Sequence, residues 1–128
     1  MLVDARDLAV MAATLAKGGI NPVSGELAAS PDSVTKALTV MTTCGMYDAA
    51  GQWFYDVGLP AKSGVGGGII AVSPGRFGIA VVSPPLDDAG NSVRAQRAIT
   101  QISNTLGANP YAATPERFDV QGTSGRGQ

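Results

Sequence analysis

Residues 62–83 read KSGVGGGIIAVSPGRFGIAVVS, and this stretch decides the fold that the sequence predicts. The β-branched run IIAV favours a strand over residues 66–73, and FGIAVVS favours a second strand over residues 77–83. The tetrapeptide SPGR between them is typical of a turn, so the strands should be antiparallel neighbours. Both are apolar throughout rather than alternating, which predicts a layered α/β structure with helices on both faces of the sheet.

Three helices are predicted around these strands, and each has a sequence signal at its ends. The first covers residues 4–16, the second runs from the N-cap Ser30 to Gly45, and the third covers residues 93–106. Asn91 or Ser92 is expected to cap the third helix. The side chains expected on the buried faces are Leu8, Met11, Ala12, Leu15, Val34, Ala37, Leu38, Met41, Ala95, Ile99, Ile102 and Leu106. A shorter helical or irregular turn over residues 51–57 carries Trp53, Phe54 and Tyr55, which are expected in the core.

Composition narrows the chemistry that the chain can perform. The chain has 128 residues, 45% of them hydrophobic and 15% charged, which is typical of one globular domain. A net charge of −1 gives no electrostatic attraction to nucleic acid or to a membrane surface, and no partner of either kind is expected. The chain has no histidine, so a Ser-His-Asp triad and most zinc or iron sites are excluded from it. No cofactor is expected, and the single Cys44 fits a reducing, cytoplasmic location.

The glycine-rich segment KSGVGGG admits three interpretations. A phosphate loop is disfavoured because the glycines miss the G-x-G-x-x-G spacing, Lys62 precedes them, and a strand follows where a helix should. A glycine-rich strand start packed against another element is the structural alternative. The third interpretation is catalytic, because a basic, hydroxyl and glycine triplet at the head of a strand is similar to the Lys-Thr-Gly motif of penicillin-binding proteins and class A β-lactamases. The N–H of Val65 would then be an oxyanion-hole donor.

Taken with its neighbours, this segment resembles the serine-dependent glutaminases, which share the β-lactamase-like fold. The resemblance is carried by MTTCGMYDAAGQW at residues 41–53, VGLPAKSGVGGGI at residues 57–69 and SPPLDDAGNSVR at residues 83–94. The opening residues 4–25 look similar too. The resemblance implies hydrolysis of L-glutamine to L-glutamate and ammonia through a serine acyl-enzyme. It also implies a homo-oligomer in the full-length enzyme.

The resemblance assigns roles to five residues. Tyr47 in GMYD corresponds to a catalytic and substrate-binding tyrosine, and Val65 to the residue whose backbone amide contacts the substrate carbonyl. Lys62, Ser63 and Gly64 match the family motif and are assigned supporting roles, namely local positive potential and shaping of the site. A tyrosine with a buried, satisfied hydroxyl is the structural alternative for Tyr47.

Other polar residues have structural interpretations. Cys44 is expected to be a small buried side chain, Asp87 and Asp88 to be loop residues, and Asn91 to be a helix cap rather than a ligand.

The sequence departs from the family at the nucleophile. The family pairs a serine with a lysine three residues on, and the one match of that kind, Ser33 with Lys36, lies near the start of the second helix where the family has no nucleophile. The chain is therefore interpreted as the C-terminal half of a glutaminase domain over residues 1–109, followed by a polar tail or linker over residues 110–128. The N-terminal half of the same domain would be its partner. A fragment of another β-lactamase-like serine hydrolase and a non-catalytic binding module remain the alternatives.

Overall fold

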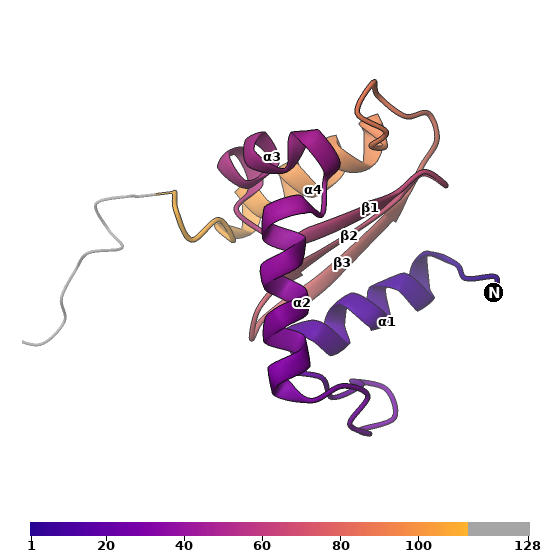
Figure 1. Ribbon diagram of the computed structural model, residues 1–128, viewed down its shortest axis with the longest axis vertical. Helices are drawn as coiled ribbons and strands as arrows, with labels where there is room; N and C mark the ends of the chain where they lie inside the picture. Colours follow the sequence, from indigo (N-terminus) through magenta and orange to yellow (C-terminus); the bar gives the residue numbers. More distant parts are fainter. Residues whose placement is uncertain (113–128) are drawn as a thin grey trace, which may run out of the picture.

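The computed structural model describes residues 1–112, which form an antiparallel sheet with helices on both faces (Figure 1). The elements in chain order are α1 (Ala5–Ala16), α2 (Pro31–Cys44), the 3-10 turn η1 (Tyr47–Ala49), α3 (Ala50–Val57), β1 (Ala61–Gly64), β2 (Gly68–Ser73), β3 (Phe77–Val82) and α4 (Val93–Leu106). The predicted combination of helices with antiparallel strands is confirmed.

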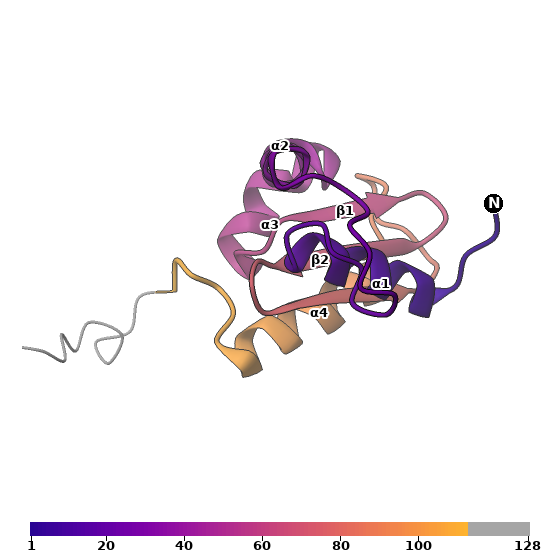
Figure 2. The same ribbon diagram turned by 90° about the horizontal axis from the view of Figure 1, so that it is seen from below.

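The three strands are ordered β1-β2-β3, with β2 in the middle. Ile69 of β2 pairs with Ser63 of β1 on one side and with Val81 of β3 on the other. The three strands therefore form one continuous antiparallel sheet. Figure 1 shows α1 on one side of the strands and α3 and α4 on the other, and Figure 2 shows the same arrangement turned by 90°. Within residues 1–112, β1 and β3 are therefore the two edges of the sheet.

Alternation along β2 divides the apolar side chains between two cores. Ile69 and Ala71 point toward α3 and α4, whereas Ile70 and Val72 point toward α1 and α2. The buried residues of the first core are Met46, Ala50, Trp53, Val57, Leu59, Ala61, Ile69, Ala71, Ala95, Ile99 and Ala108. Those of the second are Ala12, Ala16, Met41 and Val72. Apolar runs such as IIAV are thus explained by a strand that is covered on both faces, as predicted.

The helix ends follow from capping chemistry. Asp4 caps α1 in a reciprocal pair with Asp7, and Ser30 caps α2 with Pro31 in its first turn. Ser92, not Asn91, caps α4, because its hydroxyl accepts the Ala95 N–H. Asn91 is wholly buried and has other partners, which are described below.

The prediction for the first strand was wrong in its boundaries. Residues 66–73 were expected to form one strand with KSG at its head, but KSG belongs to a separate strand, β1, and β2 begins only at Gly68. The glycines between them form a hairpin loop over residues 65–67. A short strand followed by a three-residue, glycine-rich loop and an apolar run is the sequence signal that identifies such a hairpin.

Some side chains expected in the core are exposed. On α4 the buried stripe runs through Ala95, Ile99 and Ser103, so Ile102 and Leu106 face outward. Ser103 tolerates burial because its hydroxyl donates to the Val57 carbonyl at 2.8 Å. Of the three aromatic residues of α3, Trp53 is buried, whereas Phe54 is only partly buried and Tyr55 is exposed. Met11 of α1 is exposed as well.

None of the helices in the described part of the chain is long and apolar enough to cross a membrane. From residue 113 on, the tail expected over residues 110–128 lies outside the described residues.

Candidate functional site

Strand β1 presents its two polar residues to opposite sides. Ala61 and Ser63 are buried and Lys62 is exposed, which is the alternation expected of a strand with one covered face. The following loop is closed by a hydrogen bond from the Gly67 N–H to the Gly64 carbonyl at 2.9 Å. Gly67 has a φ of 92°, a conformation that L side chains rarely adopt, so glycine is required there. The hairpin thus fixes where β1 ends and where Val65 begins the loop.

The C-terminus of α2 lies directly against β1. The Ser63 N–H donates to the Gly45 carbonyl at 3.0 Å, and a Cβ on Gly45 would lie 1.7 Å from the Ala61 carbonyl oxygen. Only glycine permits this approach of backbone to backbone. The contact brings Tyr47, two residues after Gly45, to the edge of the sheet beside Lys62.

Tyr47 has an unusual backbone and a partly open side chain. Its φ is 53°, the one positive value among the described non-glycine residues, and such a conformation costs about 1–3 kcal/mol. The residue is 40% exposed, and the Lys62 Nζ lies 4.6 Å from the centroid of its ring. The alternative of a buried tyrosine with a satisfied hydroxyl is therefore wrong. Strain at an exposed polar aromatic residue is a feature of functional sites.

Ser63 contributes through a buried hydrogen bond. It is 3% exposed, and its hydroxyl donates to the Asn91 Oδ1 at 2.5 Å. The hydroxyl is thus engaged inside the chain, which favours shaping of the site over direct contact with a substrate. Lys62 donates from its Nζ to the Ser63 carbonyl, so the cation stays close to the same strand.

Asp87 and Asn91 lie in the loop before α4, which packs against β1 and the turn that carries Tyr47. Asp87 accepts the Asn91 N–H at 2.9 Å and the Gln96 Nε2 of α4 at 2.8 Å. The Gln96 side chain and then the Asn91 N–H stabilise the carboxylate, and together they hold the pKa of Asp87 below its ordinary value of 3.8. Asp87 is therefore a structural carboxylate of the loop, as predicted, whereas the expected capping role of Asn91 is wrong.

Val65 offers a backbone donor at the end of β1. It is 75% exposed, and within residues 1–112 no acceptor receives its N–H. A hollow of about 230 Å³ flanks the strand beside it and is lined by Leu8, Lys62, Ser63, Gly64, Gly68 and Ile70. A Cβ on Gly64 or Gly66 would meet nothing within 4 Å, so packing within the described residues does not require glycine at either position.

The structure thus places Tyr47 beside Lys62, and it links the side chain of Ser63, on the opposite side of β1, to the turn of Tyr47 through Asn91. Val65 lies in the loop that follows β1. The buried linking role of Asn91 was not predicted from the sequence, because Asn91 is a polar residue in a loop where cap residues are common. Its burial depends on partners 28 and 45 positions away, which no local pattern reveals.

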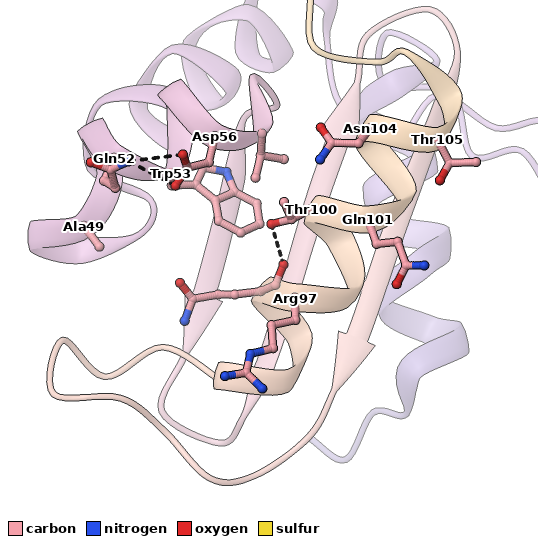
Figure 3. Close-up of a pocket in the computed structure, with 11 residues that line it drawn as sticks. Ala49, Gln52, Trp53, Asp56, Arg97, Thr100, Gln101, Asn104 and Thr105 are labelled. Carbon is pink, nitrogen blue, oxygen red and sulfur yellow. Dashed lines mark hydrogen bonds between the residues drawn. The ribbon is translucent and has the colours of Figure 1, made fainter.

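A second concave region lies elsewhere, between α3 and α4 (Figure 3). This groove has a volume of about 510 Å³, with Trp53 and Val57 among its lining residues. The polar side chains along it bond mainly within their own helices, as Gln52 does to Asp56 at 3.1 Å. None of Tyr47, Lys62, Ser63 and Val65 lines it, so we do not assign the candidate site to this groove.

The accidental Ser33 and Lys36 pair is unsuited to catalysis. Ser33 lies in the first turn of α2, where its hydroxyl accepts a hydrogen bond from the N-cap Ser30 at 2.9 Å. Lys36 instead forms an exposed ion pair with Asp32 at 2.6 Å. Cys44 is exposed, contrary to expectation, because it lies on the outer face of the last turn of α2 and its Sγ bonds to the Val40 carbonyl.

Comparisons with known proteins identify relatives of the whole described region. The family model described as Glutaminase matches residues 1–111. A glutaminase of Colwellia psychrerythraea is 59% identical over 109 residues, which cover 85% of this chain and 35% of that protein. The chain therefore spans about a third of the length of the curated relatives it matches.

Solved structures that are similar to this chain are glutaminases as well. A probable glutaminase, ybaS, matches with a TM-score of 0.84 and 47% identity over 87% of this chain and 36% of its own. A Bacillus subtilis glutaminase, captured as a covalent complex with 5-oxo-L-norleucine after reaction with 6-diazo-5-oxo-L-norleucine, matches with a TM-score of 0.79 and 31% identity. That match covers 85% of this chain and 40% of the Bacillus protein. Because these neighbours are glutaminases of the β-lactamase-like fold, the predicted fold class is confirmed.

Proposed function

The chain belongs to the glutaminase family, and we propose that it supplies the substrate side of a site that hydrolyses L-glutamine to L-glutamate and ammonia. The proposal rests on the contact between Tyr47 and Lys62 at the edge of β1. Close to this contact, the exposed Val65 has a backbone N–H that no acceptor within residues 1–112 receives. A tyrosine hydroxyl, a cation and an unpaired amide donor are the groups that an amide substrate with a carboxylate requires.

In this proposal Val65 acts through its backbone. The Val65 N–H donates to the side-chain carbonyl oxygen of glutamine and strengthens its hydrogen bond as negative charge develops there. The open space around Gly64 and Gly66 supports this role, because glycine in a strand often marks a place where a ligand approaches closely. The hollow beside β1 adds room for a small ligand.

Tyr47 is proposed to act through its hydroxyl. The ring is held beside Lys62, whose Nζ lies 4.6 Å from the ring centroid. From this place the hydroxyl binds the substrate amide and assists proton transfer to the leaving ammonia. Lys62 adds positive potential, and Ser63 keeps the strand end in place through Asn91.

The nucleophile is proposed to lie outside this chain. A serine, activated by a lysine three residues on, attacks the amide carbon, and its hydroxyl proton reaches the departing nitrogen as ammonia leaves. Water then attacks the acyl-enzyme and releases glutamate, returning the proton to the serine. The covalent complex of the Bacillus relative supports a covalent step. The match to about a third of each relative supports a part of a longer domain. We propose that residues 1–109 are its C-terminal part and work with an N-terminal part in a cytoplasmic homo-oligomer.

A direct test uses what we call the complete enzyme, in which this chain replaces the matching third of the Colwellia relative. We expect ammonia release from L-glutamine in a coupled assay, and none from this chain alone. Turnover of a peptide or a β-lactam without turnover of glutamine would favour another hydrolase of the same fold. A folded complete enzyme without any hydrolysis would favour the non-catalytic binding module.

A further inference from the structure

Asn91 joins two segments that lie far apart in the sequence. It is fully buried at the end of the loop before α4. Its Nδ2 donates to the Met46 carbonyl at 3.1 Å, and its Oδ1 accepts the Ser63 hydroxyl at 2.5 Å. The Met46 carbonyl can only accept, which fixes the orientation of the amide and leaves the oxygen for Ser63. A single side chain therefore links β1 to the turn that carries Tyr47.

The link acts on the peptide that sets the backbone of Tyr47. The Met46 carbonyl belongs to the peptide plane between Met46 and Tyr47, so a bond to its oxygen restrains the φ of Tyr47. That carbonyl also accepts the Ala49 N–H at 3.2 Å, which gives it two partners. Because Tyr47 has a φ of 53°, its conformation persists only if its surroundings hold it. The hydrogen bond from Asn91 to the Met46 carbonyl provides part of that restraint.

The neighbouring residues reinforce the arrangement. Gly90 lies beside the tyrosine ring, since a Cβ there would be 3.7 Å from the Tyr47 Cε2. Asn91 is itself anchored: its N–H donates to the Asp87 carboxylate at 2.9 Å, and its carbonyl accepts the Asp87 N–H at 2.8 Å. Gln96 of α4 holds the same carboxylate. The chain of contacts thus runs from α4 through Asp87 and Asn91 to both sides of the candidate site.

We propose that Asn91 is a positioning residue that holds Tyr47 in its left-handed conformation and Ser63 in β1, and thereby sets the geometry of glutamine hydrolysis. The role of Asn91 in catalysis rests on the proposed function, whereas its hold on Tyr47 does not. A residue of this kind should affect turnover more than substrate affinity, because it orients a group whose interaction strengthens in the transition state.

The test compares Asn91→Asp and Asn91→Ala with Asn109→Ala in the complete enzyme. Asp keeps the shape and the acceptor for Ser63 but loses the donor to Met46. Asn109 is a matched control, since it is 8% exposed and its side chain also bonds backbone groups, the Tyr55 carbonyl of α3 and the Tyr111 N–H, away from the candidate site. We expect both Asn91 variants to lower kcat by about tenfold to a hundredfold with KM within about threefold. Asn109→Ala should lose stability but keep kcat within about twofold.

A second measurement is independent of activity. With 3-fluorotyrosine incorporated, the fluorine resonance of Tyr47 should move or broaden in Asn91→Asp, whereas those of Tyr55 and Tyr111 stay in place. An unchanged Tyr47 resonance would overturn the proposal even if the enzyme proved not to hydrolyse glutamine. It would equally be overturned if folded Asn91 variants kept wild-type kcat, if Asn109→Ala lost as much, or if both Asn91 variants failed to fold while Asn109→Ala folded.

Discussion

At the scale of the residue, Tyr47 is the side chain on which the proposed chemistry depends most. Tyr47→Phe removes only the hydroxyl, so the ring can remain near Lys62 and the fold should be unchanged. We expect kcat of the complete enzyme to fall by about a hundredfold, as for the loss of a general acid or base. Steady-state kinetics with L-glutamine, combined with a thermal melt, provide the check. Wild-type turnover in a folded variant would remove Tyr47 from the site.

Val65 allows a sharper test, because its proposed role belongs to the backbone. Val65→Pro removes the N–H at the first position of the hairpin loop, a place in a turn that proline favours. Val65→Ala is the matched control that keeps the N–H. We expect the proline variant to lose about a hundredfold or more in kcat and the alanine variant to stay within about threefold. Equal activity of the two variants would exclude the Val65 N–H as the oxyanion donor.

At this scale, a residue's role could be predicted from the sequence only where neighbouring residues decide it. Ser30 and Gly45 could be placed because caps depend on the neighbouring residues. Asn91 and Cys44 could not, because burial is decided by which distant segments pack around a side chain. Asn91 was interpreted as a cap and is a buried link, whereas Cys44 was expected inside and lies outside.

At the scale of the element, the loop before α4 should make stability depend on pH. The pKa of Asp87 lies below 3.8 in the folded chain, so its carboxylate stabilises the fold above that pH. The contribution is lost as pH falls through the lower, folded value. We therefore expect Asp87→Asn to lower the melting temperature of the complete enzyme at neutral pH, and the difference from wild type to shrink as pH falls below 3.8.

The control for this experiment is Asp88→Asn, which changes an exposed neighbour in the same loop. Melts recorded by circular dichroism over a series of pH values measure both variants. If the difference in melting temperature between wild type and Asp87→Asn stayed constant with pH, the charge of the Asp87 carboxylate would contribute nothing to its hydrogen bonds with Gln96 and Asn91.

The helices could be predicted closely, and one strand could not. Residues 93–106 were predicted as the last helix and match α4, because a 3.6-residue period and a terminal glycine are strong signals. Strand β1 has only four residues, and three of them, Lys62, Ser63 and Gly64, carry no apolar signal. Its existence depends on pairing with β2 and on the contact of Ser63 with Gly45, both of which are tertiary interactions.

At the scale of the whole molecule, β3 is one of the two edge strands of the sheet in residues 1–112. It pairs only with β2 among the described residues, and its side chains are all partly or fully exposed. Such an edge favours pairing with another strand. We expect this chain alone to self-associate, and light scattering after size-exclusion chromatography measures the association.

A charged residue on that edge should oppose the association. Val82 is 47% exposed at the end of β3, so Val82→Lys should shift the chain toward the monomer. A wild-type chain that is a stable monomer with one cooperative melt would instead support an independent binding module.

The layered architecture followed from the sequence because two uninterrupted apolar strands require cover on both sides. The assembly of the site did not follow from local patterns. Tyr47 and Lys62 are fifteen positions apart, and their meeting depends on Gly45 allowing α2 to touch β1. The roles of these two residues were predicted from the resemblance to a family, because hydrophobic periodicity does not indicate which distant side chains lie together.

The central claim is that this chain provides the substrate side of a glutaminase site and that the nucleophile lies outside it. Reaction of the complete enzyme with 6-diazo-5-oxo-L-norleucine, followed by peptide mass spectrometry, tests it most directly. We predict one label, on a serine outside the 128 residues of this chain, formed more slowly in Val65→Pro than in Val65→Ala. A label on Ser33, Cys44 or any other residue of this chain would contradict the account.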